Sequence, residues 1–385
     1  MDRVLIAGAG IGGLCLAHAL QRRGLDVLVL ERAQQLTPVG AGITMQANAL
    51  TALRSIGLAS EVTSAGQVIS AASICAASGR VLSTMPGELV ERAVGAPSVA
   101  IPRAVLHEIL LRAVGAAALR LGFSVASFEQ DARGVRVVAD DGTRVEGSLL
   151  VGADGLRSRV RAQLFGDAEP RYAGYTSWRA LVDAPDLVAD GYTSETWGPG
   201  KRFGIVSLGG GQVYWFATAN EPAHGHDPQD AEQAIAALSE RFVGFHPPVP
   251  ELIRRTEKQK LVRTDIHDRD PLSSWSAGRV TLLGDAAHPM TPNLGQGGCQ
   301  AMEDAVVLAM ALQTNTLGVE DALRRYQNRR NQRTADLVLR ARKRCDVTHG
   351  KDPEVTRAWY DELREEDGSR VIGGIVANIV GNPVS

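Results

Sequence analysis

The sequence predicts a two-part α/β fold with a helical C-terminal region, and three observations support this prediction. A βαβ pattern opens the chain, because the apolar run 3–7 is followed by closely spaced glycines, a helix-like segment and a second apolar run. Between about Arg171 and Asp265 the pattern changes to strand-like segments separated by glycine-rich turns. The length of 385 residues also exceeds the size at which one hydrophobic core usually keeps growing. We therefore expect two lobes.

The first unit carries the pattern Gly8-X-Gly10-X-X-Gly13 between a buried strand and a helix. The first glycine permits a tight turn, the second lets the backbone approach a pyrophosphate, and the third allows the helix to pack closely on the strand. Free N–H groups at the helix N-terminus attract the phosphates. Glu31 ends the second strand, where it can accept hydrogen bonds from an adenosine ribose. The unit predicts a Rossmann-like dinucleotide site and alone does not separate NAD from FAD; its candidate residues are Gly8, Gly10, Ile11, Gly12, Gly13, Glu31 and Arg32.

The middle of the chain predicts an antiparallel sheet inserted into the nucleotide-binding domain. Segments 175–182, 203–208 and 212–217 are strand-like, and a helix is expected across Asp230 to Phe242, where apolar residues recur at helical spacing. Trp178 and Trp215 could line a substrate chamber, although aromatic residues that alternate in a sheet are more often core.

A third motif follows the buried strand-like run 279–283. There a glycine turn presents Asp285, whose carboxylate can accept hydrogen bonds from the ribityl hydroxyls of a flavin. The glycine-rich segment 292–298 then begins a helix, and the positive end of that helix suits an electron-rich, reduced isoalloxazine ring. We expect His288 to cap or pack this loop rather than act as a base. The motif favours FAD, and its candidate residues are Gly284, Asp285, Gly295, Gly297 and Gly298.

These patterns predict three regions. Residues 1–170 and 266–310 form a discontinuous FAD-binding domain, with some segments of 40–100 contributing to the substrate chamber; residues 171–265 form the substrate domain and residues 311–385 form C-terminal helices. One of these helices, expected over 319–344, is rich in arginine along 324–344. Apolar residues interrupt the arginines, so we expect a solvated basic face on a packed helix rather than a nucleic-acid site.

Composition excludes several classes of function. The formal net charge is −2, which gives no general attraction to nucleic acid or to an anionic membrane. The chain passes from Met1 directly into a buried strand, without a signal segment, so a cytoplasmic location is expected. The four cysteines lie far apart, which predicts reduced thiols and no metal site.

With Gly152-Ala153-Asp154-Gly155 between the first and third motifs, the chain resembles the single-component FAD-dependent aromatic hydroxylases over residues 3–310. The resemblance implies that Arg103 lies against the ribityl chain and pyrophosphate of FAD, and that Asp154 serves both FAD and the pyridine nucleotide. It also implies NADH or NADPH as co-substrate, O2, and hydroxylation of a small aromatic or N-heteroaromatic anion through a C4a-hydroperoxide of the flavin. A monomer or homodimer is expected.

The C-terminal segments 340–352 and 358–366 are similar to those of the bacterial FAD-dependent urate hydroxylases. This resemblance makes urate the leading candidate substrate and implies that Arg202, Tyr214 and Asn293 face it. Those enzymes present an aspartate at the third position, whereas asparagine cannot ionise. Arg202 is alternatively a surface arginine at a sheet edge.

Two other functions stay open at this point. The first is a flavin-dependent epoxidase or reductase of a larger apolar substrate, which an apolar groove without a substrate-facing cation would favour. The second is a flavoprotein that senses redox state or binds a partner without turnover.

Overall fold

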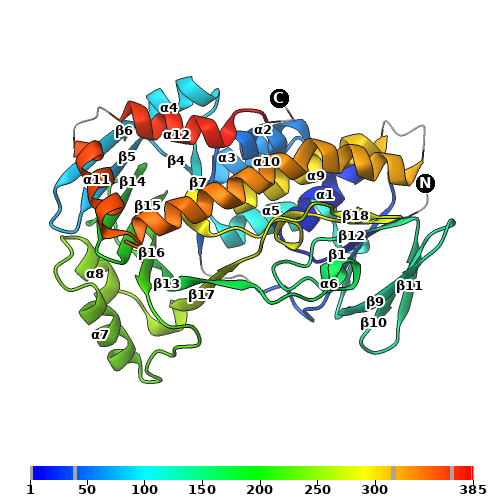
Figure 1. Ribbon diagram of the computed structural model, residues 1–385, viewed down its shortest axis with the longest axis horizontal. Helices are drawn as coiled ribbons and strands as arrows, with labels where there is room; N and C mark the ends of the chain where they lie inside the picture. The colour runs from blue at the N-terminus through cyan, green and yellow to red at the C-terminus, as the bar shows by residue number, and fades with distance from the viewer. Residues whose placement is uncertain (1–2, 38–40, 314–317, 365–367, 383, 385) are drawn as a thin grey trace.

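The computed structural model describes residues 3–37, 41–313, 318–364, 368–382 and 384. Its two main sheets lie side by side, the nucleotide-binding sheet on the right of Figure 1 and a larger sheet on the left. The long helix α10 (Val319–Thr348) runs across both parts.

The nucleotide-binding sheet has six strands and a parallel centre. Strand β1 (Val4–Ala7) is fully buried and pairs in parallel with β2 (Val27–Glu31) on one side and β12 (Leu149–Gly152) on the other. This arrangement confirms the βαβ unit. The sheet order is β18 (Ser276–Ala277), β19 (Val280–Leu282), β12, β1, β2 and β8 (Leu119–Leu121), with only β18 antiparallel to its neighbour.

Three helices build the core beside this sheet. Helix α1 (Ile11–Gln21) contacts both α5 (Arg103–Val114) and α9 (Gly297–Gln313). Nearly all of α9 is buried, which explains the unbroken apolar run over 305–312 in its second half. The beginnings of α1, α5 and α9 carry the glycine and arginine residues of the predicted cofactor site, so the helical core fixes those residues relative to one another.

The larger sheet has seven strands. They are arranged in the order β17 (Val262–Asp268), β13 (Arg171–Asp183), β16 (Gln212–Asn220), β15 (Lys201–Gly209), β14 (Tyr192–Gly198), β5 (Ala71–Ala76) and β6 (Val81–Pro86). All neighbours are antiparallel except β14 and β5, which pair in parallel. The sheet expected between 171 and 265 is therefore antiparallel apart from one pair, and it is extended by two strands from an earlier part of the chain.

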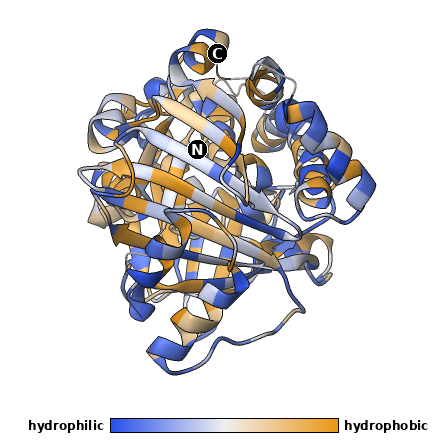
Figure 2. Ribbon diagram, turned by 90° about the vertical axis from the view of Figure 1, so that its left-hand side faces the viewer, coloured by the Kyte–Doolittle hydropathy of each residue, from blue (hydrophilic) through white to orange (hydrophobic). Residues whose placement is uncertain are grey.

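A second hydrophobic core lies on one face of the larger sheet. Helices α7 (Ala231–Arg241) and α8 (Val249–Arg254) cover it, and Trp178 and Trp215 are buried within it. Apolar residues run along the strands in Figure 2, whereas the outer helices present polar residues to solvent. The two tryptophans are therefore core residues rather than chamber walls, and α7 confirms the helix expected across 230–242.

The remaining elements connect and cover these layers. A small sheet joins β3 (Gly42–Met45), β7 (Val99–Pro102) and β4 (Gln67–Val68), and another joins β9 (Val125–Gln130), β10 (Val135–Ala139) and β11 (Arg144–Gly147). The other helices are α2 (Ala47–Ser55), α3 (Ala59–Ala65), α4 (Gly87–Val94), α6 (Arg159–Phe165), α11 (Pro353–Arg364) and α12 (Ser369–Ile379). Short 3-10 helices are η1 (Ala116–Ala118), η2 (Lys258–Lys260), η3 (Gly284–Ala286) and η4 (Pro292–Leu294). No helix within the described ranges is long and apolar enough to cross a membrane.

The arginine-rich helix α10 differs from its expected solvated basic face at several positions, most of all at Arg330; the side chains of Arg333 and Arg342 are also only 13% and 18% exposed. Arg330 is fully buried, donates to Asp304 Oδ1 at 2.7 Å and forms an ion pair with Glu303, both on α9. The expectation was wrong for Arg330 because two buried carboxylates on the neighbouring helix compensate its charge. Arg324 keeps to the expectation, with a side chain that is 70% exposed.

Candidate active site

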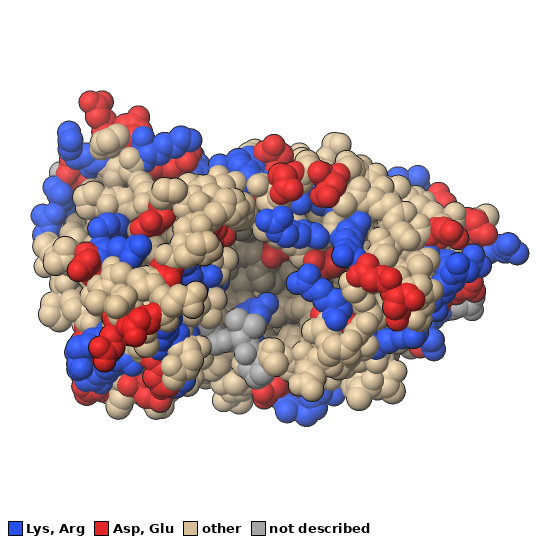
Figure 3. Space-filling model, turned by 90° about the horizontal axis from the view of Figure 1, so that it is seen from below, with Lys and Arg blue, Asp and Glu red and all other residues tan. Residues whose placement is uncertain are grey.

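A cavity of about 360 Å³ lies at the carboxyl end of β1 and β2, and we call it the nucleotide cavity. The predicted residues Gly8, Gly10, Glu31, Arg32, Arg103 and Asp154 line it. Arg157 and Arg159 add two more cations to the lining, and in Figure 3 Lys and Arg side chains gather beside the hollow between the two parts of the molecule. Guanidinium groups at such a site favour an anion such as a pyrophosphate.

The glycine turn after β1 is held by close backbone contacts. Gly8 has φ of +105°, a conformation that side chains disfavour, and a Cβ at Gly13 would lie 2.0 Å from the Gly8 carbonyl oxygen. Gly12 packs in the same way against Leu283, so Gly12 and Gly13 join the helix to the sheet. A Cβ at Gly10 would meet nothing within 4 Å, which leaves its backbone open to a ligand. Ile11 is buried as the first residue of α1.

Glu31 is fixed by the backbone beside this turn. The amide of Ala9 donates to one carboxylate oxygen at 2.8 Å and the amide of Ala33 donates to the other at 2.9 Å. Each oxygen retains a lone pair that can accept from a ribose hydroxyl.

Asp154 has two different oxygens. Its Oδ2 accepts from the amides of Arg159 and Val160 at the start of α6, whereas its Oδ1 is buried without a hydrogen-bond partner among the described residues. Burial raises the pKa of this carboxyl. Arg103, on the opposite element α5, has a pKa lowered by burial and partly restored by the charge of Asp285.

Asp285 connects the nucleotide cavity to the third motif. Protein surrounds the carboxyl on most sides and raises its pKa through desolvation, while His288 and Arg103 oppose that shift. The side chain is nonetheless reached by solvent, and it makes no hydrogen bond within the described part of the chain. Its Oδ1 lies 3.8 Å from the position of a Cβ at Gly297, the first residue of α9. An unpaired acid beside a helix N-terminus can bind a hydroxyl-bearing chain.

A buried network holds this motif in place. Asp304 Oδ2 accepts from the Gly284 amide at 3.0 Å and lies 2.6 Å from His288 Nε2, while Asp304 Oδ1 accepts from Arg330. Desolvation would raise the pKa of Asp304, but the neighbouring His288 and Arg330 lower it to about 2. His288 therefore packs the loop, as expected, and its Nε2 is engaged by a carboxylate.

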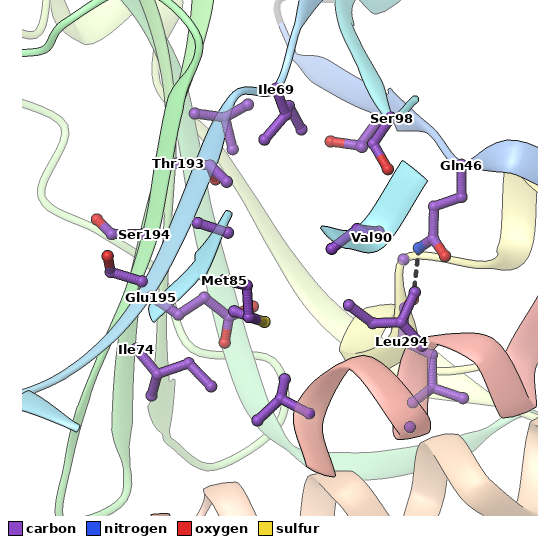
Figure 4. A pocket seen from close by; sticks show the side chains of 18 of the residues that line it. Gln46, Ile69, Ile74, Met85, Val90, Ser98, Thr193, Ser194, Glu195 and Leu294 are labelled. Atoms are coloured by element: carbon purple, nitrogen blue, oxygen red, sulfur yellow. Dashed lines mark hydrogen bonds between the residues drawn. The ribbon is translucent and has the colours of Figure 1, made fainter. Parts of the chain in front are cut away.

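A second cavity, of about 320 Å³, lies between the larger sheet, the loop before α9 and helix α12; we call it the chamber. Figure 4 shows Glu195 and Met85 pointing into it and the hydrogen bond from Gln46 to the Leu294 carbonyl, which is 3.0 Å long. Most of its wall is apolar, including Ile69, Ile74, Met85, Val90, Phe216, Leu294, Val371 and Ile375. Gly295 also lines the chamber, and Gly298 packs on Ile43 beside it.

Arg202 lines the chamber and is 4% exposed, so it is not the surface arginine of the alternative interpretation. Its Nη2 lies 2.5 Å from Glu195 Oε2, which also accepts from Trp197 Nε1 at 2.9 Å. Burial alone would raise the pKa of Glu195, but the charge of Arg202 lowers it, and Glu195 in turn raises the pKa of Arg202. The pair is therefore fully ionised.

Asn293 also lines the chamber, and its amide is oriented by two neighbours. Tyr175 Oη donates to Asn293 Oδ1 at 2.9 Å, and Asn293 Nδ2 donates to Thr348 Oγ1 at 3.5 Å. The Tyr175 ring stacks on His349 at 4.1 Å. Burial and the nearby Arg202 charge lower the pKa of His349 to about 3, so the imidazole is neutral.

Tyr214 is not part of the chamber wall. Its ring lies against Gly42 of β3, where a Cβ would be 2.6 Å away, and burial raises the pKa of its hydroxyl. The structure thus brings Arg202 and Asn293 together at one cavity, and Tyr214 is not among the residues that line it.

Two charged residues of the chamber, Glu195 and Arg344, were not predicted from the sequence. The turn at 198–200 offered a signal for Glu195. It sets the register of the β14–β15 hairpin, in which Trp197 pairs with Arg202, and Glu195 lies on the same face of β14 two residues before Trp197. No local pattern distinguishes Arg344 from the other arginines of α10.

The residues of the two cavities fit FAD. Asp154 Oδ1 and the Asp285 carboxylate lack partners within the described chain, and the open backbone at Gly10 and the arginines suit a pyrophosphate. Asp285 and Gly297 lead from Arg103 in the nucleotide cavity to Gly295 in the chamber. When bound, reduced FAD activates O2 for transfer of an oxygen atom to an electron-rich ring carbon. The fold and site define a flavoprotein with a substrate chamber at the far end of its cofactor site.

Comparison with known proteins agrees with this class. Residues 1–341 match the family described as FAD binding domain, and the chain belongs to this family of FAD-dependent monooxygenases. It is 51% identical over 335 residues to the aurachin C monooxygenase/isomerase of Stigmatella aurantiaca, covering 87% of this chain and 86% of that protein. It is 40% identical over 391 residues to the FAD-dependent urate hydroxylase of Mycolicibacterium vanbaalenii, covering 100% of this chain and 98% of that protein. The structure of Klebsiella pneumoniae HpxO complexed with FAD and uric acid aligns with a TM-score of 0.94 at 36% identity, over 100% of this chain and 98% of that one.

Proposed function

We propose that this enzyme hydroxylates the ring of a small aromatic or N-heteroaromatic anion in the chamber, with NADH or NADPH as reductant and urate as the first candidate. The overall reaction consumes the ring substrate, O2, NAD(P)H and a proton and yields the ring hydroxylated at carbon, water and NAD(P)⁺. The hydrogen displaced from the ring comes from the hydroxylated carbon or, for urate, whose ring carbons carry no hydrogen, from a ring nitrogen. The observation that carries the proposal is the position of the chamber, which is lined by Asn293 and Gly295 of the glycine-rich segment that ends the third cofactor motif and leads into α9.

The chain contributes three functions to this chemistry. The apolar wall excludes water from the reacting atoms. Asn293, oriented by Tyr175 and Thr348, presents an amide that can donate to or accept from the ring substituents. Glu31, Asp154, Arg103 and Asp285 are proposed to hold the cofactor. We propose that Tyr214 acts as a positioning residue, since its ring supports β3 and Thr44 of that strand lines the chamber.

The charges of the chamber favour a hydroxylase over an epoxidase of a large apolar substrate. Arg202 and Arg344 both line the cavity, so it is not an apolar groove without cations. The carboxamide of Asn293 adds no negative charge to the chamber, which suits an anionic ring.

A substrate panel tests the proposal. The holoenzyme is incubated with urate, salicylate and neutral heteroaromatic rings, and both NAD(P)H loss and oxygenated product are measured. We expect at least one anionic ring to accelerate NAD(P)H oxidation and to be recovered with an added hydroxyl group. Stimulation by isoprenoids alone would replace the proposal with the epoxidase alternative. The cytoplasmic location and the monomeric or homodimeric state stay predictions of the sequence.

A further inference from the structure

Among the described residues, two arginines and one carboxylate line the polar end of the chamber. Arg202 and Glu195 neutralise each other through a direct ion pair, so the charge left over belongs to Arg344. Arg344 makes no hydrogen bond or ion pair through its side chain within the described ranges, and it is half-buried. Burial lowers its pKa, with a partial opposing effect of Glu195, but arginine stays protonated throughout the physiological range.

Arg344 is nevertheless held in a defined place. Its guanidinium carbon lies 4.6 Å from the centroid of the Trp359 ring. Trp359 stacks on Trp197 at 4.3 Å, and Trp197 donates to Glu195. A guanidinium that rests on an aromatic face keeps its in-plane N–H groups available for a planar anion. Arg344 is thus positioned and charged, and none of the described residues uses its N–H donors.

We infer that Arg344, rather than Arg202, binds the anionic group of the substrate. This inference rests on the proposed function and deepens it. The Arg202 guanidinium already binds Glu195, with 2.5 Å between Nη2 and Oε2. A substrate anion at Arg202 would therefore lie close to the Glu195 carboxylate, and the two negative charges would repel each other in a desolvated site. An anion at Arg344 meets an uncompensated cation instead. The substrate class is therefore a planar ring with one negative charge, whose remaining surface contacts the apolar wall.

Glu195 acts in this scheme as a specificity residue. By occupying Arg202 it leaves the polar end with one net positive charge, which matches a monoanion. Its removal would leave two cations facing the chamber. Anion binding should therefore become stronger when Glu195 is replaced by glutamine, and this gain should compensate for the loss of Arg344.

The test is a binding titration of the oxidised holoenzyme, followed through the flavin absorption spectrum, with urate, with salicylate and with neutral salicylamide as probes. We expect Arg344→Gln to weaken urate and salicylate binding by at least about tenfold while salicylamide binding changes by less than about twofold. Arg344→Lys should restore part of the loss. The matched control is Lys343→Gln, which removes the same charge from the neighbouring exposed position and should leave all three affinities unchanged.

The double variant Glu195→Gln/Arg344→Gln should bind the two anions more tightly than Arg344→Gln alone. Equal weakening of salicylate and salicylamide by Arg344→Gln would assign the residue a structural role and overturn the inference. Unchanged anion affinity in that variant, or wild-type enzyme that binds neither anion, would overturn it as well. Because the titration needs no turnover, a wild type that binds the anions and never hydroxylates a ring contradicts the proposed function alone.

Discussion

Replacing Arg330 with glutamine should destabilise the protein more than any substitution on the exposed face of the same helix. Arg330 is fully buried, and its guanidinium contacts Asp304, Glu303 and the side-chain oxygen of Gln300, the last at 2.6 Å. Both carboxylates have no exposed surface, so loss of the cation leaves buried negative charge that, among the described residues, Arg333 and His288 alone are paired with. Breaking a buried ion pair from one side typically costs about 3–5 kcal/mol, which is our estimate for the free energy of unfolding.

The matched control is Arg324→Gln on the same helix, whose ion pair with Asp321 joins a side chain that is 70% exposed. Exposed pairs contribute about 0–1 kcal/mol, so this variant should unfold close to wild type. Urea unfolding followed by circular dichroism, at one fixed excess of FAD, compares the three proteins. A loss below about 1 kcal/mol for Arg330→Gln, equal to that of Arg324→Gln, would refute the argument that the buried network stabilises the third motif.

Three further predictions concern the cofactor site and the chamber. Asp285→Ala should raise the dissociation constant of FAD at least about tenfold, because it removes the unpaired acid beside α9. The control Asp141→Ala, on an exposed turn, should leave that constant unchanged. Equilibrium dialysis with FAD measures both, and equal affinities of the two variants would contradict the role of Asp285. Gly13→Ala should yield protein without bound FAD, since the added carbon would lie 2.0 Å from the Gly8 carbonyl oxygen. The control Gly373→Ala has open space around the added carbon and should keep the yellow colour of bound FAD. FAD retained by Gly13→Ala would show that the turn can relax. The pKa of His349 is lowered from 6.5 to about 3, so the unfolded chain binds the extra proton between these values and stability falls as the pH drops through that window. Between pH 6.5 and pH 5 the free energy of unfolding should fall by about 2 kcal/mol through this group. Urea unfolding at the two pH values measures that fall, and His349→Gln should make it smaller by the same amount. An unchanged fall in the variant would contradict the lowered pKa of His349.

The cofactor motifs could be predicted because their chemistry is local. A glycine at a turn, an acid at a strand end and a helix that follows at once are all fixed within about 30 residues of sequence, and their positions need only one βαβ unit. Gly8, Gly13 and Glu31 accordingly lie where the pattern requires. The insertion of a second sheet was also visible, since strand-like segments with glycine turns differ from the helical parts.

The assembly of the chamber could not be predicted in the same way. Strand β5 joins the larger sheet beside β14, and its residues pair with partners more than a hundred positions later. The two cations among the described lining residues of the chamber come from β15 and from α10, and nothing in the sequence of either element shows that Arg202 is paired and that Arg344 is not. The burial of Arg330 likewise depends on carboxylates of α9 that only tertiary packing brings near.

Turnover in isotopically labelled O2 tests the assignment as a ring-hydroxylating FAD monooxygenase most directly. The purified holoenzyme is supplied with NADH or NADPH and with the panel substrate that most accelerates NAD(P)H oxidation, and the product is examined by mass spectrometry. We predict that one labelled oxygen atom appears on the ring for each substrate molecule converted, with the other recovered in water. NAD(P)H oxidation that yields only hydrogen peroxide with every ring in the panel, or a product whose new oxygen comes from water, would contradict it.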